Sequence, residues 1–164
     1  MDSIRKTALH ESGHAVVGYL EGLRVESAAL KTEAGTPGVL LSGPGMDVIE
    51  LNLALACALL AGPLAVGLAE GYDPSFLSEP DSSEKDVQMA ADCVAAAFKE
   101  SLFLYDDTEL DWERLSKKRI KMMLRQHWKT VEAMADALCS KPPYALTGEE
   151  AIEIIERAEG IKSY

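Results

Sequence analysis

The chain has 164 residues, of which 48% are hydrophobic and 26% charged, a composition typical of one soluble globular domain. Its formal charge of -11 leaves no excess of lysine and arginine, so we expect neither nucleic acid nor an anionic membrane surface as a partner. The cysteines lie among apolar residues and form no Cys-x-x-Cys pair. The N-terminus has no apolar signal region. We therefore expect a cytoplasmic location and free, buried thiols at Cys57, Cys93 and Cys139.

The first predicted element is a helix over residues 3–21, with Gly22 as its stop. The segment 24–31 then alternates weakly between apolar and polar residues. After a Gly/Pro turn at 35–38, residues 39–41 form a short apolar run. Together these segments predict a small antiparallel pair of strands.

The remainder is predicted to be helical. A long helix is expected from about residue 47 to residue 70, bent or broken near Pro63. Its uncharged part, 53–69, is shorter than the roughly 20 residues that span a membrane and has acidic flanks, so we expect a buried core helix. Further helices are expected at 82–104, at 106–139 and, after the capping box that begins at Thr147, up to about 158.

These elements indicate a single domain over residues 1–164, mostly α with a minor antiparallel β pair. In the helix expected at 106–139, the apolar side chains are assigned to the core: Trp112, Leu115, Ile120, Met123, Leu124 and Trp128.

The first helix contains the stretch Thr7-Ala-Leu-His10-Glu11-Ser-Gly-His14-Ala-Val-Val-Gly18. His10 and His14 stand four residues apart, so a helix brings both imidazoles to one face, where they can bind one Zn²⁺. Glu11 lies one position round the helix, close enough to take a proton from the attacking water without ligating the metal. This is the His-Glu-x-x-His signature of zinc-dependent hydrolases.

A catalytic zinc site typically has three protein ligands, so the third must come from another element. Asp86 is the best-placed candidate, because it lies in the first turn of the helix expected after a Gly/Pro-rich loop. The apolar residues that follow it would pack inward and carry it toward the core. Helix capping or a solvated face is the ordinary alternative for such an aspartate. The other candidate ligands are Glu79, Asp81, Asp92 and His127.

Four stretches of the chain resemble the peptidase domain of the FtsH-type, membrane-anchored AAA+ zinc proteases. Residues 7–18 are similar to the family's T-A-x-H-E-A-G-H-A-x-x-G, and 61–65 resemble a small-residue turn after its second helix. Residues 86–91 are similar to the D-I-x-x-A-T stretch, and 144–150 to E-T-L-x-G-E-E. The resemblance implies a helical zinc-peptidase fold with Asp86 as the third zinc ligand.

The departures from the family bear on function. The sequence has no G-x-x-x-x-G-K-[S/T] phosphate loop and no predicted membrane helix, so we expect neither the ATPase nor the anchor in this chain. Pro63 and Val66 also replace the family's usual glycine/arginine and acidic residues. Either the chain cleaves peptides that are already accessible, or it works with a separate ATPase, or it has lost activity.

The sequence thus predicts an ATP-independent zinc metalloendopeptidase, in which His10, His14 and Asp86 bind Zn²⁺ and Glu11 is the general base. Its substrate would be a peptide or an unfolded protein. The run Gly38-Val39-Leu40 would be an exposed strand that pairs with an extended substrate, as the resemblance suggests, or else an ordinary core strand.

Two alternatives compete with the enzyme. One is a catalytically weak or inactive relative that serves as a binding or adaptor module, and the other is a structural helical protein with a chance motif. A homo-oligomer is compatible with the resemblance.

Overall fold

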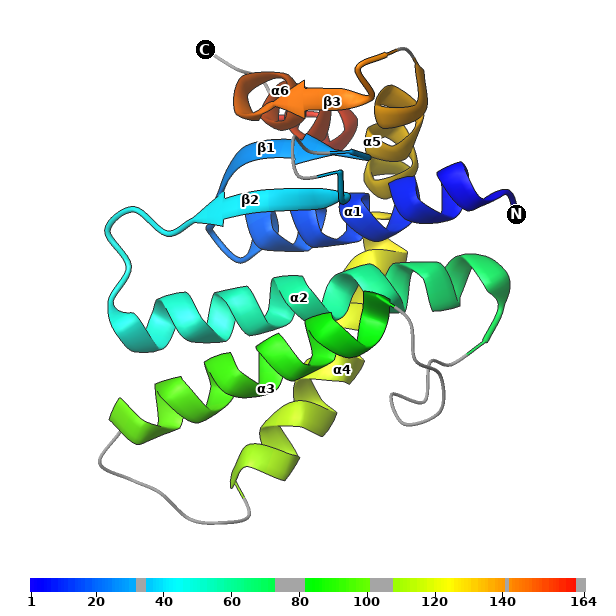
Figure 1. The fold of residues 1–164 in the computed structure, drawn as a ribbon. Helices are drawn as coiled ribbons and strands as arrows, with labels where there is room; N and C mark the ends of the chain where they lie inside the picture. Colours follow the sequence, from blue (N-terminus) through cyan, green and yellow to red (C-terminus); the bar gives the residue numbers. More distant parts are fainter. Residues whose placement is uncertain (32–34, 73–81, 101–107, 141, 162–164) are drawn as a thin grey trace.

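The computed structural model describes residues 1–31, 35–72, 82–100, 108–140 and 142–161, without the side chains at 82–83, 100 and 108–115. Its elements, in chain order, are α1 (Ser3–Leu20), β1 (Arg24–Ala29), β2 (Gly38–Ser42), α2 (Val48–Glu70), α3 (Ser82–Glu100), α4 (Thr108–Gln126), α5 (Trp128–Ser140), β3 (Ala145–Thr147) and α6 (Gly148–Glu159). The predicted fold class, mostly helical with a small antiparallel sheet, is confirmed (Figure 1).

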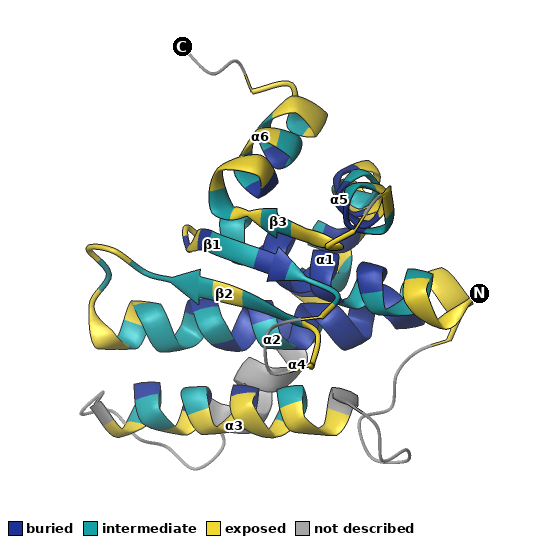
Figure 2. Cartoon of the chain, turned by 45° about the horizontal axis from the view of Figure 1, so that its top comes forward, coloured by how far each residue is buried: buried dark blue, intermediate teal, exposed yellow. Residues whose placement is uncertain are grey.

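Helix α1 lies at the centre of this arrangement. The sheet, α5 and α6 cover one side of it, and α2 covers the other, with α3 and α4 packed beyond α2 (Figure 1). From Ala8 to Gly18 every residue of α1 is buried except His10, which is half-buried. The dark blue of α1 and α2 in Figure 2 shows that these two helices supply a large part of the core. The motif stretch is therefore enclosed by protein and not laid on a surface.

The predicted strand pair is confirmed. Strand β1 pairs antiparallel with β2, with Val25 opposite Leu41 and Ala29 opposite Gly38. The sequence did not indicate β3, which pairs with the other side of β1 and contributes only residues 145–147. Because the strand order is β2-β1-β3, β2 lies at an edge of the described sheet.

Helix α2 begins at the capping box formed by Asp47 and Glu50 and ends at Gly71 in the left-handed conformation. It runs through Pro63 as one helix, so of the predicted bend or break the break is wrong. Pro63 is buried between packed helices, and this packing offsets the one hydrogen bond that proline cannot make. By length and composition α2 could cross a membrane, but 67% of its most apolar window is buried inside the protein, as expected of a core helix.

The prediction of one helix over 106–139 is wrong, because α4 ends at Gln126 and α5 begins at Trp128. His127 lies between them, and its Nδ1 is 2.8 Å from Oε2 of Glu159, at the end of α6. Thr130, in the first turn of α5, donates its hydroxyl to the same carboxylate. The local sequence has no glycine or proline that would predict a break between α4 and α5. At this break the chain instead contacts Glu159, which lies 32 residues after His127 and 29 after Thr130.

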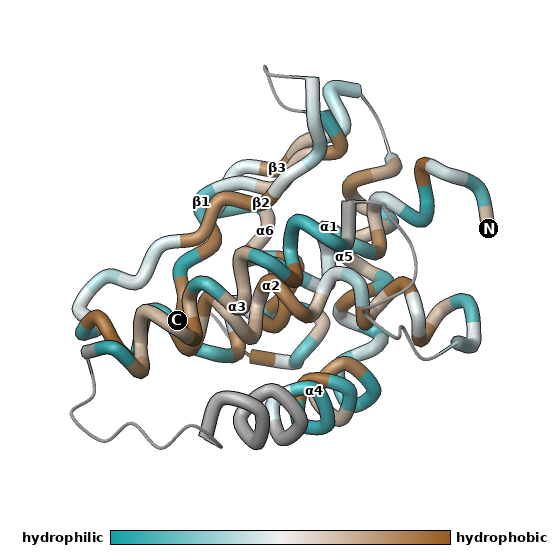
Figure 3. Tube along the Cα trace, turned by 60° about the horizontal axis from the view of Figure 1, so that its bottom comes forward, coloured by the Kyte–Doolittle hydropathy of each residue, from teal (hydrophilic) through white to brown (hydrophobic). Residues whose placement is uncertain are grey.

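Several expected core positions are confirmed. Ile120 and Leu124 are fully buried, and Met123 and Trp128 pack against the core from partly exposed positions, while Trp112 and Leu115 lie outside the described side chains. The other positions of residues 116–126 in α4 are largely hydrophilic, which appears as teal in Figure 3. The three cysteines are free as expected, but only Cys57 is fully buried.

Replacing Glu159 with Gln should lower the free energy of unfolding by about 1–2 kcal/mol at neutral pH, because the carboxylate receives hydrogen bonds from two residues at the α4–α5 break. Burial disfavours the charged form of Glu159, but hydrogen bonds from Thr130 and His127 and the charge of His127 outweigh it, so its pKa lies below the ordinary value of 4.5. The stabilisation is therefore complete above pH 4.5 and disappears as the pH falls through the lowered pKa.

Urea unfolding of wild type and Glu159→Gln at several pH values measures this difference. Glu153→Gln is the matched control on α6, because Glu153 pairs with Arg157 at an exposed site and should change stability by less than about 0.5 kcal/mol. Equal effects of the two substitutions at pH 7 would contradict the role given to Glu159.

Candidate metal centre

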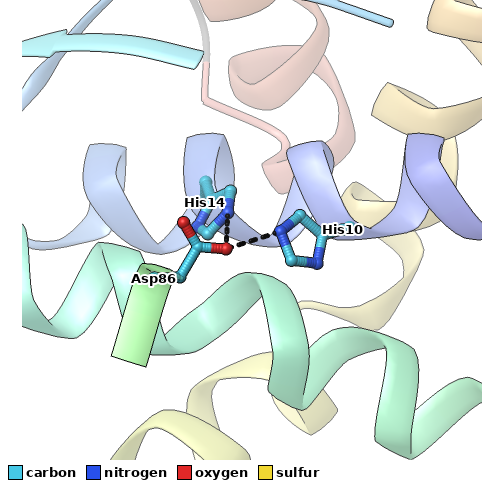
Figure 4. Close-up of side chains that lie close together, drawn as sticks. All are labelled: His10, His14 and Asp86. Carbon is cyan, nitrogen blue, oxygen red and sulfur yellow. Dashed lines mark hydrogen bonds and ion pairs between the residues drawn. The ribbon is translucent and has the colours of Figure 1, made fainter. Parts of the chain in front are cut away.

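The structure brings together His10, His14 and Asp86, from α1 and the first turns of α3. Oδ2 of Asp86 is 2.8 Å from Nε2 of His10 and 3.4 Å from Nε2 of His14 (Figure 4). The three ligand atoms all lie within 4.8 Å of one another. His10 and Asp86 are 76 residues apart in the sequence, and the packing of α3 on α2 brings them together.

The hydrogen bonding of His14 fixes which ring nitrogen faces the cluster. Its Nδ1 is 2.8 Å from the backbone carbonyl oxygen of Ala58 on α2. A carbonyl only accepts, so Nδ1 carries a proton and donates it. In the neutral ring, which is the form that binds a metal, the lone pair is then on Nε2, which faces Asp86. Metal-binding histidines in proteins are usually oriented by such a bond from the other ring nitrogen.

Of the two distances from Asp86 Oδ2 to the imidazoles, one matches the spacing of ligands around a Zn²⁺ ion and the other is shorter. Two ligands of a tetrahedral Zn²⁺ with bonds of about 2.0–2.1 Å are about 3.3–3.4 Å apart. The separation of 3.4 Å between His14 Nε2 and Asp86 Oδ2 meets this value. The separation of 2.8 Å between His10 Nε2 and Asp86 Oδ2 is that of a hydrogen bond and would have to widen by about 0.5 Å.

Gly62 on α2 leaves the space that the two imidazoles occupy. A Cβ atom at this position would lie 2.5 Å from Nε2 of His14 and 3.0 Å from Nε2 of His10. No ordinary packing arrangement accepts such distances to an imidazole ring. A residue with any side chain at position 62 would therefore displace both predicted ligand atoms.

The side chains of the cluster are largely shielded from water. The exposed fractions of the side chains are 12% for His10, 9% for His14 and 17% for Asp86. Burial disfavours the charged form of Asp86, but hydrogen bonds and charges from the two histidines outweigh it and hold the pKa of Asp86 well below its usual range. The carboxylate is therefore ionised at neutral pH, as a metal ligand must be.

The predicted base, Glu11, is also buried, with 4% of its surface exposed. Burial raises the pKa of its carboxyl, while the nearby His14 and His10 lower it by less. For His14, burial lowers the pKa, but the hydrogen bond and charge of Asp86 together with the charge of Glu11 outweigh this and raise it. Two carboxylates and two imidazoles thus share one poorly solvated site.

A cleft of about 550 Å³ leads to the cluster. His10, Glu11 and His14 line it together with residues 38–41 of β2, and α3 contributes Asp86. The predicted substrate strand therefore lies beside the predicted metal ligands, and Leu40 is 62% exposed at its edge. The sequence did not indicate the side chains of α3 that complete the wall, Lys85, Met89 and Cys93, although their spacing of four residues is visible in it.

The rival ligands do not take the place of Asp86. Asp92 is exposed on α3 and accepts a hydrogen bond from Gln88. His127 is paired with Glu159 at the α4–α5 break. Glu79 and Asp81 lie outside the described residues. Among the described His, Cys, Asp and Glu side chains, only His10, His14 and Asp86 form a group of at least three with metal-ligand spacing.

Comparisons with known proteins do not add to this picture, since the chain matches no protein-family model and no curated protein. The candidate site therefore depends on the residues and their geometry alone.

Replacing Asp86 with Ala should lower the affinity for zinc by about 100-fold or more, because two imidazoles on one helix then hold the ion alone. Zinc content after dialysis against a competing chelator measures the loss. Asp92→Ala is the control on the same helix and should retain wild-type zinc content. Undiminished zinc in Asp86→Ala would mean that another group is the third ligand.

Replacing Gly62 with Ala should also impair zinc binding, because the added methyl group would collide with both ligand rings. The overpacking should lower the free energy of unfolding by about 1–3 kcal/mol. Gly18→Ala, inside α1, is the control, since its methyl group would meet the flexible end of Leu41 and make an ordinary 3.6 Å contact with Cβ of Ala58, and should leave zinc affinity unchanged. Isothermal titration with Zn²⁺ compares the two variants, and equal affinities would exclude this role for Gly62.

Proposed function

We propose that the protein is a zinc-dependent metallopeptidase that hydrolyses peptide bonds in extended polypeptides. The observation that carries this proposal is the convergence of His10, His14 and Asp86 at a cleft that Glu11 also lines. The resemblance to FtsH-type peptidase domains supports the proposal at these same four residues.

His10, His14 and Asp86 are the proposed ligands of the ion. Two imidazole nitrogens and one carboxylate oxygen form a donor set typical of catalytic zinc sites and leave room for a further ligand. Zinc bound there would lower the pKa of water toward about 7 and polarise a peptide carbonyl.

Glu11 is the proposed general base. Its carboxylate is in the cleft, next in sequence to His10, and its low exposure limits competition from bulk water. From this position it would accept a proton from the attacking water and transfer it to the nitrogen of the leaving amine. No other carboxylate among the described lining residues is free for this role, because Asp86 is engaged by both imidazoles.

Strand β2 is proposed to hold the substrate. It is an edge strand of the described sheet, and Gly38, Val39 and Leu40 line the cleft. An extended peptide can add to such an edge through main-chain hydrogen bonds, which place it without demanding a particular sequence. This mode of binding requires an unfolded segment, so peptides and already unfolded proteins are the proposed substrates of the chain by itself.

Glu11→Gln should retain zinc and lose at least about 100-fold in kcat/KM, because the amide cannot accept the proton. Cleavage of unfolded casein and of quenched fluorescent peptides by the zinc-loaded protein, with and without chelator, measures the activity. Glu153→Gln, at an exposed position on α6, is the matched control and should keep full activity.

Full activity of Glu11→Gln would exclude Glu11 as the base. If the zinc-loaded wild type cleaves no peptide, the enzymatic proposal fails and the alternative of a binding or adaptor module is favoured.

A further inference from the structure

The wall of the cleft formed by α3 carries an ordered stripe of side chains. Lys85, Met89 and Cys93 follow one another at intervals of four residues, so they lie along one face of the helix, and all three line the cleft. Asp86 lies next to the start of this stripe. Along α3 the wall of the cleft therefore begins with the positively charged Lys85 and continues with the apolar side chains of Met89 and Cys93.

Lys85 is distinguished by its charge. It is the only lysine or arginine among the described residues that line the cleft. Its side chain is exposed, and it makes no hydrogen bond or ion pair with another described residue. No described carboxylate therefore lies within ion-pair distance of the ammonium group, although the chain as a whole carries a formal charge of -11.

The other charged groups of the cleft indicate what Lys85 could bind. Glu11 and Asp86 give the cleft two carboxyl groups, and Asp86 is already bound by His10 and His14. A Zn²⁺ ion in the proposed site would balance these two carboxylates, but the protein as a whole, with its formal charge of -11, would still repel a negatively charged substrate. Lys85 supplies a local cation for a substrate carboxylate, and an ammonium–carboxylate pair is stronger than a neutral hydrogen bond.

The arrangement of β2 and α3 fixes the spacing of such a substrate. Both elements run in the same direction (Figure 1), and both line the cleft together with residues of α1 and α2. The rise of about 1.5 Å per helical residue places Lys85 and Met89 about 6 Å apart along α3. An extended peptide covers this distance in about two residues, so side chains two positions apart on the same face would meet Lys85 and Met89.

We propose that Lys85 is a specificity-determining residue that binds a carboxylate of the substrate, two residues from an apolar side chain seated against Met89. This inference rests on the proposed function of the same cleft. The carboxylate can belong to an aspartate or glutamate side chain or to the C-terminus of the peptide, and the test separates these sources.

Binding to zinc-loaded Glu11→Gln protein tests recognition without hydrolysis. The probes are fluorescein-labelled Ala/Ser peptides with one Leu and, two positions before or after it, Glu or Gln. A second pair ends two positions after the Leu as a free acid or an amide. Fluorescence anisotropy at low and high salt measures the affinities.

The Glu peptide or the free acid should bind about three to ten times more tightly than its neutral partner, and high salt should reduce the difference. Adding Lys85→Gln should abolish the preference and leave binding of the neutral peptide unchanged, while Lys85→Arg should retain it. Lys99→Gln, near the other end of α3, is the matched control and should also retain it. The pair that shows the preference identifies the source of the carboxylate.

Equal binding of charged and neutral peptides by the Glu11→Gln protein would overturn the proposal. So would a Lys85→Gln substitution that weakens both peptides alike. Failure of the wild type to cleave any of these peptides would instead reject the peptidase function, because recognition is measured separately from hydrolysis.

Discussion

The close approach of α1 and α2 is the constraint on which the candidate site depends. A Cβ atom at Gly13 would lie 2.7 Å from the carbonyl oxygen of Ala61, and one at Gly62 would occupy the place of the imidazoles. Two glycines, one on each helix, thus let the backbones approach and leave a space for the rings. The bond from His14 to the carbonyl of Ala58 then orients one ring in that space.

Helix α3 adds the acidic ligand from outside this pair. Its buried face consists of the small or branched side chains Ala90, Val94 and Ala97, and Figure 2 shows the opposite face exposed. The partly buried Val87, Cys93 and Phe98 also pack against the core, and the contacts of Asp86 with two imidazoles add polar interactions at the start of this helix. The chemistry of the site and the position of α3 are in this way linked.

The local sequence predicts well those features that local interactions decide. The extent of α1, the strand pair β1–β2 and the capping box at Thr147 follow from spacing, caps and apolar periodicity. By these signals Asp86 is only the best placed of several candidate ligands, and the resemblance singles it out; its approach to the histidines depends on the packing of α3 on α2. The break at His127 depends on Glu159, and the continuity of α2 at Pro63 depends on burial. The residues next to His127 and Pro63 reveal neither the contact with Glu159 nor the burial. The space that Gly62 leaves for the imidazoles is likewise not apparent from its neighbours in the sequence.

The open edge of β2 also has a consequence for the protein in concentrated solution. Unpaired backbone groups beside an exposed Leu40 offer a template not only to a peptide but to the equivalent strand of another molecule. Pairing of two such edges would cover both clefts at once, to an extent that rises with the square of the protein concentration. The feature proposed to bind a substrate therefore also exposes the protein to self-association.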